Sequence, residues 1–438
     1  MNISIIPKPQ RLTILSDNTF DHRVSDIMEC QDGTIPAEGY RLEIDQNGIR
    51  IFCSDEAGAF YGRMTVRQLL AQGKLPELII EDYPQYVYRG LMLDCCRHFF
   101  PVAVIKGLLD QMAALKLNVL HWHLSDDQGI RIESKAYPQL QKVGSKRAGT
   151  CGDQKPVSGY YTQEEMREVV AYARQRHIHV MPELEMPGHA AAAIAAYKGI
   201  SCQQKEILVK ETFGIHTDVL CPGKEDTYRF VFAVLDELFE IFPFPYIHLG
   251  GDEAPRTRWR TCPDCRRVIR ENRLKNYDEL QALYMNRVAA YCKAHGKTVV
   301  NWNDGMKGRN ISSEIVMQYW SEGPKQAALL RTALKRGGKV ILSPCRNYYL
   351  DYSYRKTPLK KTFSYNPAQF GEGVLGVEAT LWTEYVEDES QIQHQLFPRL
   401  LAVAERAWSE WHRDFDGFLS RTEHLQPHFG KISIDNRS

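Results

Sequence analysis

The sequence lacks the features that would point to a nucleic-acid or membrane partner. Its 55 basic and 54 acidic side chains leave a net charge of +1, so there is no basic surplus for a phosphate backbone or an anionic bilayer. The longest uncharged stretch of small residues, GHAAAAIAAY at 188–197, is far too short to span a membrane. The first residues, MNISIIPKPQ, lack the uninterrupted apolar core of a secretory signal. We therefore expect a cytoplasmic protein with neither kind of partner.

Cysteine lacks a regular spacing as well. The 11 cysteines are odd in number and scattered through 438 residues, and a chain of this length needs no disulfides to fold, so we expect reduced thiols. The segment CPDC at 262–265 has the spacing of half a zinc site, but the sequence has no second C-x-x-C. We interpret it as a tight turn with two free thiols. Whether Cys262 and Cys265 bind a metal, with Cys202 or Cys221 as further ligands, stays open.

The pattern of apolar residues changes near residue 85. Residues 1–85 predict a small α+β domain. In it, YRLEIDQNGIRIF at 40–52 indicates two strands around the turn Asn47-Gly48, and residues 55–72 have helical spacing. Residues 86–438 are predicted to form a second domain that ends in a C-terminal helical tail.

Eight short apolar runs recur after residue 85, with amphipathic segments between most of them. They lie at 90–96, 118–124, 178–184, 246–251, 298–302, 315–320, 339–344 and 373–382. Near-continuous apolar strands that alternate with helices are typical of a parallel sheet covered on both faces. Eight such units predict an α/β fold, the (β/α)8 TIM barrel. The segments after the fifth and seventh runs look weakly helical, so we expect an incomplete outer ring there.

Polar and aromatic residues gather where these runs end. In (β/α)8 barrels the chemistry takes place at the C-terminal ends of the strands, and stability alone requires no acids or tryptophans at one rim. The candidate rim residues are Arg97, Asp126, Glu183, Glu185, His189, Asp252, Glu253, Trp302, Asp304, Trp320, Trp382 and Glu384. We therefore expect a site at this end of the barrel.

Two adjacent acids, Asp252 and Glu253, follow the fourth run and the glycines at 250 and 251. The glycines can end the regular pleating, so that a bend brings both carboxylates into one cleft. Two close acids oppose each other's ionisation, which raises the pKa of one of them and makes it a plausible proton donor at neutral pH. Taken alone, the pair is also compatible with a helix cap or a solvated turn.

Trp302, Trp320 and Trp382 each lie where a different strand should end. An indole ring stacks on the C–H face of a sugar and forms an apolar wall for an acetyl methyl group. Any one of them is equally well explained as a large core residue. Three at equivalent positions favour a sugar-binding pocket.

Five segments resemble, in the same order, those of glycoside hydrolase family twenty, the exo-acting β-N-acetylhexosaminidases. They are YRGLMLDCCRHFFP (88–101), KLNVLHWHLSDDQGIRIE (116–133), MPELEMPGH (181–189), HLGGDEAP (248–255) and ATLWTE (379–384). The resemblance covers roughly residues 85–410, and the N-terminal unit resembles the α+β domain that commonly precedes this barrel. It implies release of a terminal β-linked GlcNAc or GalNAc from a small saccharide or glycoconjugate, with neither cofactor nor metal.

The resemblance also implies roles for the acids. Glu253 would be the general acid that protonates the leaving glycosidic oxygen. Asp252 would orient the nitrogen of the substrate's 2-acetamido group, whose carbonyl oxygen attacks the anomeric carbon to give an oxazolinium intermediate. Tyr349 would donate a hydrogen bond to that acetamide oxygen. Enzymes of this type have no nucleophile of their own and depart from the usual two-carboxylate scheme.

Further binding residues follow from the same resemblance. Arg97 and Glu384 would bind the ring hydroxyls at O3 and O4, and Asp351, in the segment NYYLDY, would reach the outer hydroxyls. Asp126 and His189 resemble a supporting pair that tunes the general acid.

The tryptophans have implied roles too: Trp302 and Trp320 would wall the acetyl group, and Trp382 would lie under the sugar ring. Two segments depart from the family pattern. NWND at 301–304 stands where Gly-Trp-Asp/Glu is expected, and Ile130 stands where tryptophan is common. Neither change touches the acid or its partner, so they bear on the shape of the entrance and leave the reaction unchanged.

Two functions of other classes remain open at this stage. A catalytically silent sugar-binding barrel needs the aromatic walls but has no use for the acid. The His-x-His at 121–123 invites comparison with metal-dependent amidohydrolases, although it lies inside a strand and packed, hydrogen-bonded histidines are the default interpretation. The choice between GlcNAc and GalNAc, the aglycone and the oligomeric state cannot be derived from the sequence.

Overall fold

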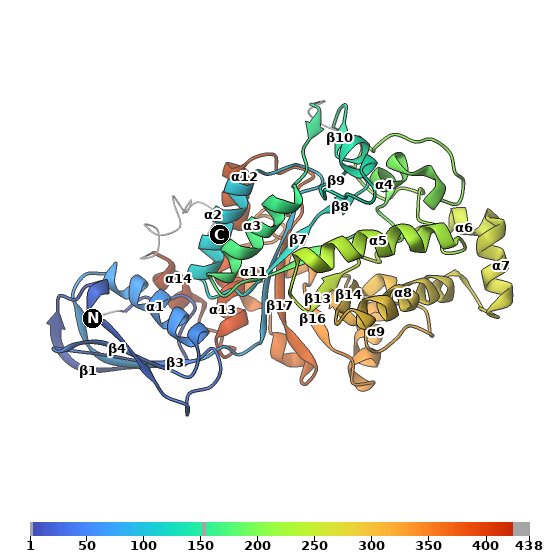
Figure 1. Cartoon of the computed structure of the whole chain (residues 1–438). Helices are drawn as coiled ribbons and strands as arrows, with labels where there is room; N and C mark the ends of the chain where they lie inside the picture. The colour runs from blue at the N-terminus through green and yellow to red at the C-terminus, as the bar shows by residue number, and fades with distance from the viewer. Residues whose placement is uncertain (1–2, 151–154, 424–438) are drawn as a thin grey trace.

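The computed structural model describes residues 3–150 and 155–423, which form a five-stranded sheet with one helix and a closed barrel (Figure 1). The sheet lies to the left in Figure 1 and packs against one end of the barrel. None of the helices in the described ranges is long and apolar enough to cross a membrane.

The N-terminal sheet has the strand order β1-β5-β3-β4-β2. Its strands are β1 (Arg11–Phe20), β2 (Ile27–Gln31), β3 (Tyr40–Asp45), β4 (Gly48–Cys53) and β5 (Leu75–Asp82). The predicted hairpin is confirmed, because β3 and β4 pair antiparallel and Asp45 faces Gly48 across the turn. Helix α1 (Glu56–Leu70) covers one face of the sheet, and the side chain of Asp55 caps it by accepting a hydrogen bond from the backbone N–H of Gly58.

Eight parallel strands close the barrel, so the predicted (β/α)8 fold is confirmed. In barrel order they are β6 (Tyr88–Asp94), β7 (Val119–His123), β12 (His179–Glu183), β13 (Tyr246–His248), β14 (Thr298–Trp302), β15 (Val316–Tyr319), β16 (Val340–Leu342) and β17 (Val374–Leu381). Seven of the strands lie within one of the apolar runs, and β6 begins at Tyr88, two residues before its run. All eight point the same way, which brings their C-terminal ends to one rim.

The outer ring is incomplete where the sequence predicted it. Regular helices cover most of the barrel: α2 (Val102–Ala114), α3 (Gln163–Arg174), α5 (Glu225–Ile241), α8 (Tyr277–Ala294), α9 (Pro324–Lys335), α12 (Glu389–Leu396) and α13 (Arg399–Trp408). After the fifth strand there is only a 3-10 turn at Asn303–Gly305, and after the seventh there are two short helices, α10 (Cys345–Tyr348) and α11 (Leu359–Ser364).

Shorter elements extend the loops at the C-terminal rim of the barrel: the hairpin β8 (Ser125–Asp126) and β9 (Gly129–Ile130), helix α4 (Ala191–Ala196), the 3-10 turn η3 (Lys198–Ile200), α6 (Thr257–Thr261) and α7 (Pro263–Glu271). The last described helix is α14 (Phe415–Glu423). The remainder of the predicted C-terminal tail, residues 424–438, lies outside the described residues.

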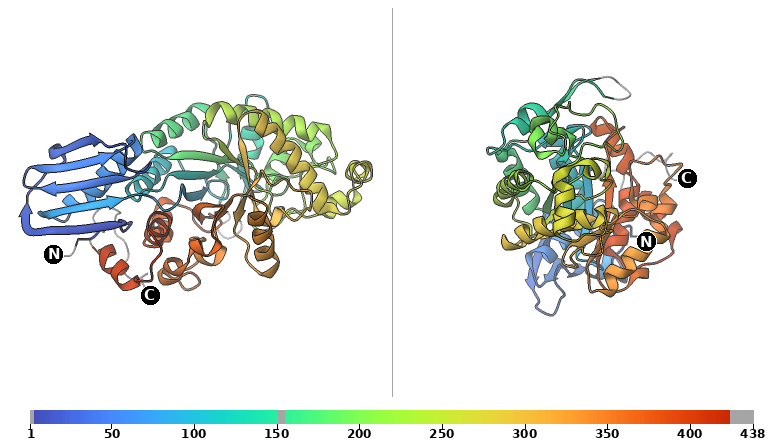
Figure 2. Two further views of the ribbon diagram at one scale, coloured as in Figure 1. Left: turned by 90° about the horizontal axis from the view of Figure 1, so that it is seen from below. Right: turned by 90° about the vertical axis from the view of Figure 1, so that its right-hand side faces the viewer.

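The N-terminal sheet lies beside the barrel (Figure 2), and a buried polar cluster fastens the two together. Asp82, at the end of β5, accepts hydrogen bonds from Lys116 Nζ at 2.8 Å, from the Tyr40 hydroxyl at 2.5 Å and from Trp408 Nε1 at 2.8 Å. The side chains of Asp82 and Lys116 are fully buried, and Lys116 Nζ also donates to the Tyr40 hydroxyl at 2.8 Å, so hydrogen bonds support this buried ion pair. One apolar core runs through both parts of the chain.

Candidate active site

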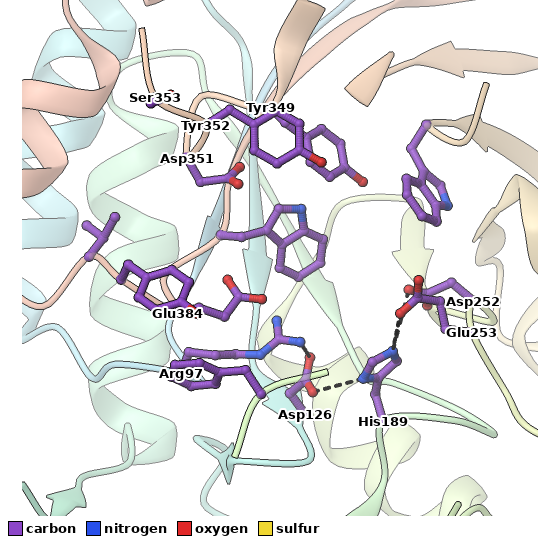
Figure 3. A pocket seen from close by; sticks show the side chains of 15 residues that line it. Arg97, Asp126, His189, Asp252, Glu253, Tyr349, Asp351, Tyr352, Ser353 and Glu384 are labelled. Atoms are coloured by element: carbon purple, nitrogen blue, oxygen red, sulfur yellow. Dashed lines mark hydrogen bonds and ion pairs between the residues drawn. The ribbon is translucent and has the colours of Figure 1, made fainter. Parts of the chain in front are cut away.

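A cavity of about 460 Å³ opens at the C-terminal rim of the barrel (Figure 3). All the residues to which the family resemblance assigned a role line it except Trp302, whereas Glu183, Glu185 and Asp304 of the candidate rim residues do not. The lining residues are Arg97, Asp126, His189, Phe213, Asp252, Glu253, Trp320, Tyr349, Asp351, Tyr352, Ser353, Trp382, Glu384, Tyr385 and Val386. They come from segments after seven different strands of the barrel, so only the closed fold assembles them.

The backbone bends sharply after β13 and brings both acids into the cavity. Gly250 and Gly251 have φ angles of +61° and +101°, and Glu253 itself has a φ of +42°. A Cβ atom on Gly250 would lie 1.7 Å from a carboxylate oxygen of Glu185, so the approach requires glycine. The left-handed conformation of Glu253 costs free energy, as is common for residues held in place at functional sites. The bend explains how neighbouring residues face the same cleft (Figure 3).

The two carboxylates have different environments. The side chain of Asp252 is 11% exposed and that of Glu253 is 33% exposed. Burial, together with the negative charges of Asp304 and Glu253, raises the pKa of Asp252 to about 7 against the attraction of His189. Its Oδ1 accepts no hydrogen bond from any described residue. Asp252 is thus a buried acceptor at the cavity wall, while Glu253 reaches further into the open space.

A chain of charged side chains supports Glu253 from one side (Figure 3). Arg97 Nη2 lies 2.9 Å from Asp126 Oδ2, and Asp126 Oδ1 lies 3.1 Å from His189 Nδ1. His189 Nε2 in turn lies 3.6 Å from Glu253 Oε2 and 3.8 Å from Asp252 Oδ2. Burial disfavours the charged imidazole, but Asp126 outweighs it and holds the pKa of His189 well above its usual range. The predicted pair Asp126 and His189 therefore presents a positive charge to both acids.

The opposite side of the cavity carries two further acids, Asp351 and Glu384 (Figure 3). Burial and the neighbouring Glu384 raise the pKa of Asp351 to about 7. Burial also raises the pKa of Glu384, although the Arg97 guanidinium opposes this. Oδ1 of Asp351 is buried and accepts no hydrogen bond from a described residue. This side of the cavity offers acceptors and one cation, a combination suited to several hydroxyl groups.

Aromatic rings form the wall between the two pairs of acids. The rings of Trp320 and Tyr349 are nearly parallel, with centroids 5.9 Å apart, and Trp382 lies 6.2 Å from Tyr349. The guanidinium of Arg97 lies over the Trp382 ring, with Cζ 5.1 Å from the ring centroid. Burial and nearby acids, Asp252 first among them, keep the pKa of Tyr349 well above its usual range, so its hydroxyl stays a hydrogen-bond donor.

Trp302 does not reach the cavity wall, where the family resemblance placed it. It is 1% exposed, and its Nε1 donates to Glu183 Oε1 at 2.9 Å below the cavity floor. The reason is strand register. Trp302 still pairs with Gln318 as the last residue of β14, so its side chain points into the barrel. Trp320 and Trp382 lie one residue beyond their strands, where the chain turns toward the cavity.

Asp304, a candidate rim residue to which the sequence analysis assigned no role, contacts both Glu253 and Trp320. Its Oδ2 accepts a hydrogen bond from the backbone N–H of Glu253 at 3.0 Å, and its Oδ1 accepts one from Trp320 Nε1 at 3.0 Å. The preceding Asn303 accepts hydrogen bonds from the backbone N–H groups of Trp320 and Ser321. The segment NWND therefore contacts the backbone of Glu253, contrary to the expectation from the sequence, and positions Glu253 and Trp320 together.

Ile130, the second departure from the family pattern, is fully buried in the short β8–β9 hairpin. It does not line the cavity. The sequence suggested that this departure would change the shape of the cavity entrance. The structure shows no such change at residue 130.

The histidines of the His-x-His motif form hydrogen bonds to buried carboxylates. His121 lies between Glu183 at 3.1 Å and Glu378 at 2.9 Å. His123 contacts Glu183 through one ring nitrogen and Asp126, at 2.9 Å, through the other. Burial opposes protonation, yet Glu183 and Asp126 raise the pKa of His123 to about 10. The motif therefore belongs to a packed network beneath the site.

The sequence did not identify every lining residue. Phe213 and Tyr385 form an edge-to-face pair at the mouth of the cavity, with ring centroids 5.6 Å apart, and Tyr385 is 80% exposed. Both lie in loops whose conformation no apolar pattern specifies. Tyr352 directly follows Asp351, and its adjacency to a predicted residue was the signal available for it.

Comparison with protein families decides the relationship. The model described as "Glycosyl hydrolase family 20, catalytic domain" matches residues 86–411, and that for domain 2 of the same family matches residues 19–83. The chain belongs to glycosyl hydrolase family 20. The resemblance inferred from the sequence is therefore confirmed.

Named relatives of this family 20 chain are similar over most of its length. A β-hexosaminidase of Porphyromonas gingivalis is 39% identical over 416 residues, which cover 88% of this chain and 53% of the relative. A β-hexosaminidase of Akkermansia muciniphila is 35% identical over 428 residues, which cover 93% of this chain and 86% of that relative. The chain thus spans about half the length of the first relative and most of the second.

Solved structures agree with the family 20 fold. The crystal structure of a β-N-acetylhexosaminidase superimposes with a TM-score of 0.91 at 32% identity, covering 98% of this chain and 96% of that one. The β-N-acetylhexosaminidase of Streptomyces coelicolor A3(2) superimposes with a TM-score of 0.85 at 30% identity, and the match covers 98% of this chain and 96% of that one.

Proposed function

We propose that this family 20 chain is a retaining exo-β-N-acetylhexosaminidase, which releases terminal β-linked GlcNAc or GalNAc by substrate-assisted catalysis. The observation that carries the proposal is the bend at Gly250–Glu253, which turns two neighbouring carboxylates into one cavity. A similar protein, a mutant Streptomyces plicatus β-hexosaminidase, has been solved in complex with its product GlcNAc, at 30% identity to this chain and a TM-score of 0.84.

Glu253 is the proposed general acid. Its carboxyl group is the more exposed of the pair and stands at the open side of the cavity, where a glycosidic oxygen can approach. It donates its proton to that oxygen as the bond to the anomeric carbon breaks, and the leaving alcohol departs. The carboxylate left behind faces the positive charge of His189 at 3.6 Å, which stabilises it until water restores the proton.

Asp252 is the proposed partner of the acetamide. The acetamide carbonyl oxygen attacks the anomeric carbon, and positive charge develops on the acetamide nitrogen as the oxazolinium ring forms. The buried Oδ1 of Asp252, which no described donor occupies, is placed to accept the N–H and to stabilise that charge. Tyr349 donates to the acetamide oxygen from the same wall. Water then opens the ring and leaves the β configuration unchanged.

The remaining wall suits one sugar ring. Trp320 and Trp382 offer apolar faces, and Arg97, Asp351 and Glu384 offer charged partners for hydroxyls. A cavity of about 460 Å³ has the size of a small-molecule site, which favours action at a chain end. GlcNAc and GalNAc differ in the direction of one hydroxyl, and we propose that the site accepts either.

The test uses an alkyl β-GlcNAc glycoside, whose leaving alcohol must be protonated, and the variant Glu253→Gln, which keeps the shape of the acid and removes its proton. We expect cleavage by the wild type and a loss of activity of at least about 100-fold in Glu253→Gln, the lower range for a general acid. A matched control is Glu271→Gln on the exposed helix α7, which should leave kcat/KM unchanged. Binding of GlcNAc without any hydrolysis would instead identify a silent sugar-binding protein.

The proposed compartment is the cytoplasm. None of the described cysteines forms a disulfide, which suits a reducing compartment. Fractionation of the source cells with an antibody to the chain tests this, and recovery from the periplasm or the medium would contradict it.

A further inference from the structure

Four cysteines from three separate segments meet outside the cavity. Cys202 lies just after η3, Cys221 lies in the following loop, and Cys262 and Cys265 begin helix α7 at the right-hand end of Figure 1. Cys262 is the N-cap of α7, and Cys265 lies in its first turn. The sequence showed the C-x-x-C half of this group, and only the fold supplies the other two thiols.

The sulfur atoms have the spacing of a metal site. Sγ of Cys221 lies 3.7 Å from that of Cys262 and 3.6 Å from that of Cys265, and Cys202 lies 3.8 Å from Cys265. All four sulfurs lie within 4.8 Å of one another. Tetrahedral zinc with Zn–S bonds of about 2.3 Å requires sulfur separations of about 3.8 Å. A disulfide requires about 2.05 Å, so the observed distances do not fit one.

The surroundings match a closed structural site. Cys221, Cys262 and Cys265 are buried, and Cys202 is half-buried. Their apolar neighbours include Trp259, Val219 and Leu280. Four thiolate ligands leave no position open for substrate, which distinguishes a structural zinc site from a catalytic one. Soft sulfur ligands in a tetrahedron select zinc over the hard cations that prefer oxygen.

We propose that Cys202, Cys221, Cys262 and Cys265 together bind one structural Zn²⁺ ion. The sequence suggested that CPDC is a tight turn with two free thiols. In this proposal CPDC instead supplies two of the four ligands of a metal site. The proposal goes beyond the hydrolase activity and does not depend on it.

The site would clamp two loops that carry catalytic side chains. Gly223 lies so close to α7 that a Cβ atom there would come within 2.4 Å of the Asp264 backbone. Nearby, Trp259 Nε1 donates to the carbonyl of Leu220 at 2.9 Å, and the N–H of Leu220 donates to the carbonyl of Pro187 at 2.8 Å. These contacts join the segment after Glu253 to the segment before His189. The ion thus holds the geometry of the rim without touching the cavity.

The experiment measures metal bound to the full chain after purification with zinc present and removal of loosely bound ions. We expect one zinc per chain by elemental analysis. The double variant Cys262→Ser/Cys265→Ser should lose it, whereas Cys345→Ser, which changes a half-buried thiol outside the group, should retain it. A strong chelator should lower the Tm of the wild type, and added zinc should restore it.

A second measurement covers the case in which the double variant fails to fold. Wild-type protein grown with cobalt in place of zinc should bind one Co²⁺ and show the visible absorption of tetrahedral cobalt thiolate. Wild-type protein without stoichiometric zinc would overturn the proposal. Stoichiometric iron in its place, or a disulfide between any two of the four cysteines, would overturn it as well. Loss of hydrolysis is not a criterion, so this test is independent of the proposed activity.

Discussion

Replacing Asp304 should impair Glu253, the proposed general acid, while leaving its carboxyl group in place. Asp304 is 9% exposed and holds the backbone of Glu253 and the indole of Trp320 through two hydrogen bonds of 3.0 Å. A hydrogen bond to a charged group contributes about 1.5–3 kcal/mol, so the two contribute about 3–6 kcal/mol. On removal of Asp304, we expect about half of this free energy to raise the activation barrier and the remainder to lower the free energy of unfolding. Asp304→Ala should then lower kcat/KM by about 10- to 200-fold.

The assay compares leaving groups. An aryl glycoside with an acidic phenol needs little protonation, whereas an alkyl glycoside or a disaccharide needs the full help of Glu253. Asp304→Ala should therefore lose more activity on the alkyl substrate than on the aryl one. Asp304→Asn keeps one acceptor oxygen and should lose less on both. Asp278→Ala, which removes a partly exposed partner of Arg256, serves as the control and should be near wild type.

Two results would refute this reasoning. Activity of Asp304→Ala within twofold of the wild type would mean that the two hydrogen bonds do not hold the acid in place. An equal loss on aryl and alkyl substrates would mean that Asp304 acts on substrate binding through Trp320 alone. The Tm of each variant is measured alongside, so that unfolding is not mistaken for lost catalysis.

Three further predictions concern pH, the domain contact and the bend. Asp252 must be ionised to accept the acetamide, so with a pKa of about 7 kcat/KM should fall about tenfold for each pH unit below 7, and a flat profile down to pH 5 would contradict this. Asp82→Leu leaves the buried charge of Lys116 unpaired and should lower the free energy of unfolding by about 3–5 kcal/mol in urea; a change below 1 kcal/mol would contradict the buried pair. Gly250→Ala puts a Cβ atom 1.7 Å from a carboxylate oxygen of Glu185 at a positive φ. It should lower the free energy of unfolding by at least about 2 kcal/mol and also lower kcat/KM. Wild-type values of both would show that the bend tolerates a side chain.

The barrel could be predicted from the sequence because its strands are buried on both faces. Each strand therefore forms an apolar run, and the polar residues that follow the runs mark the rim. Strand β1 (Arg11–Phe20) gave no such signal, because its side chains are exposed or half-buried throughout and show no alternation. Its place in the sheet is set by pairing with β5, a contact between residues about sixty positions apart.

The sequence predicted site residues correctly where a local motif determines the backbone conformation. It did not do so where strand register or loops distant in the sequence determine the position of a side chain. The pair Asp252-Glu253 follows a glycine bend, and the structure places both acids as expected. Trp302 lies a single residue too early, inside the ladder of β14, so its ring faces the barrel core. The sulfur cluster joins Cys202 and Cys221 to CPDC through loops that have no periodic pattern. Only the fold could bring them together.

The central claim is that the substrate's own acetamide is the nucleophile and that Asp252 holds it. The most direct measurement compares kcat/KM for nitrophenyl β-GlcNAc and nitrophenyl β-glucoside, which differ by that group. We predict cleavage of the first and no detectable cleavage of the second. Equal cleavage of both would show that the acetamide takes no part, and the role given to Asp252 would be wrong.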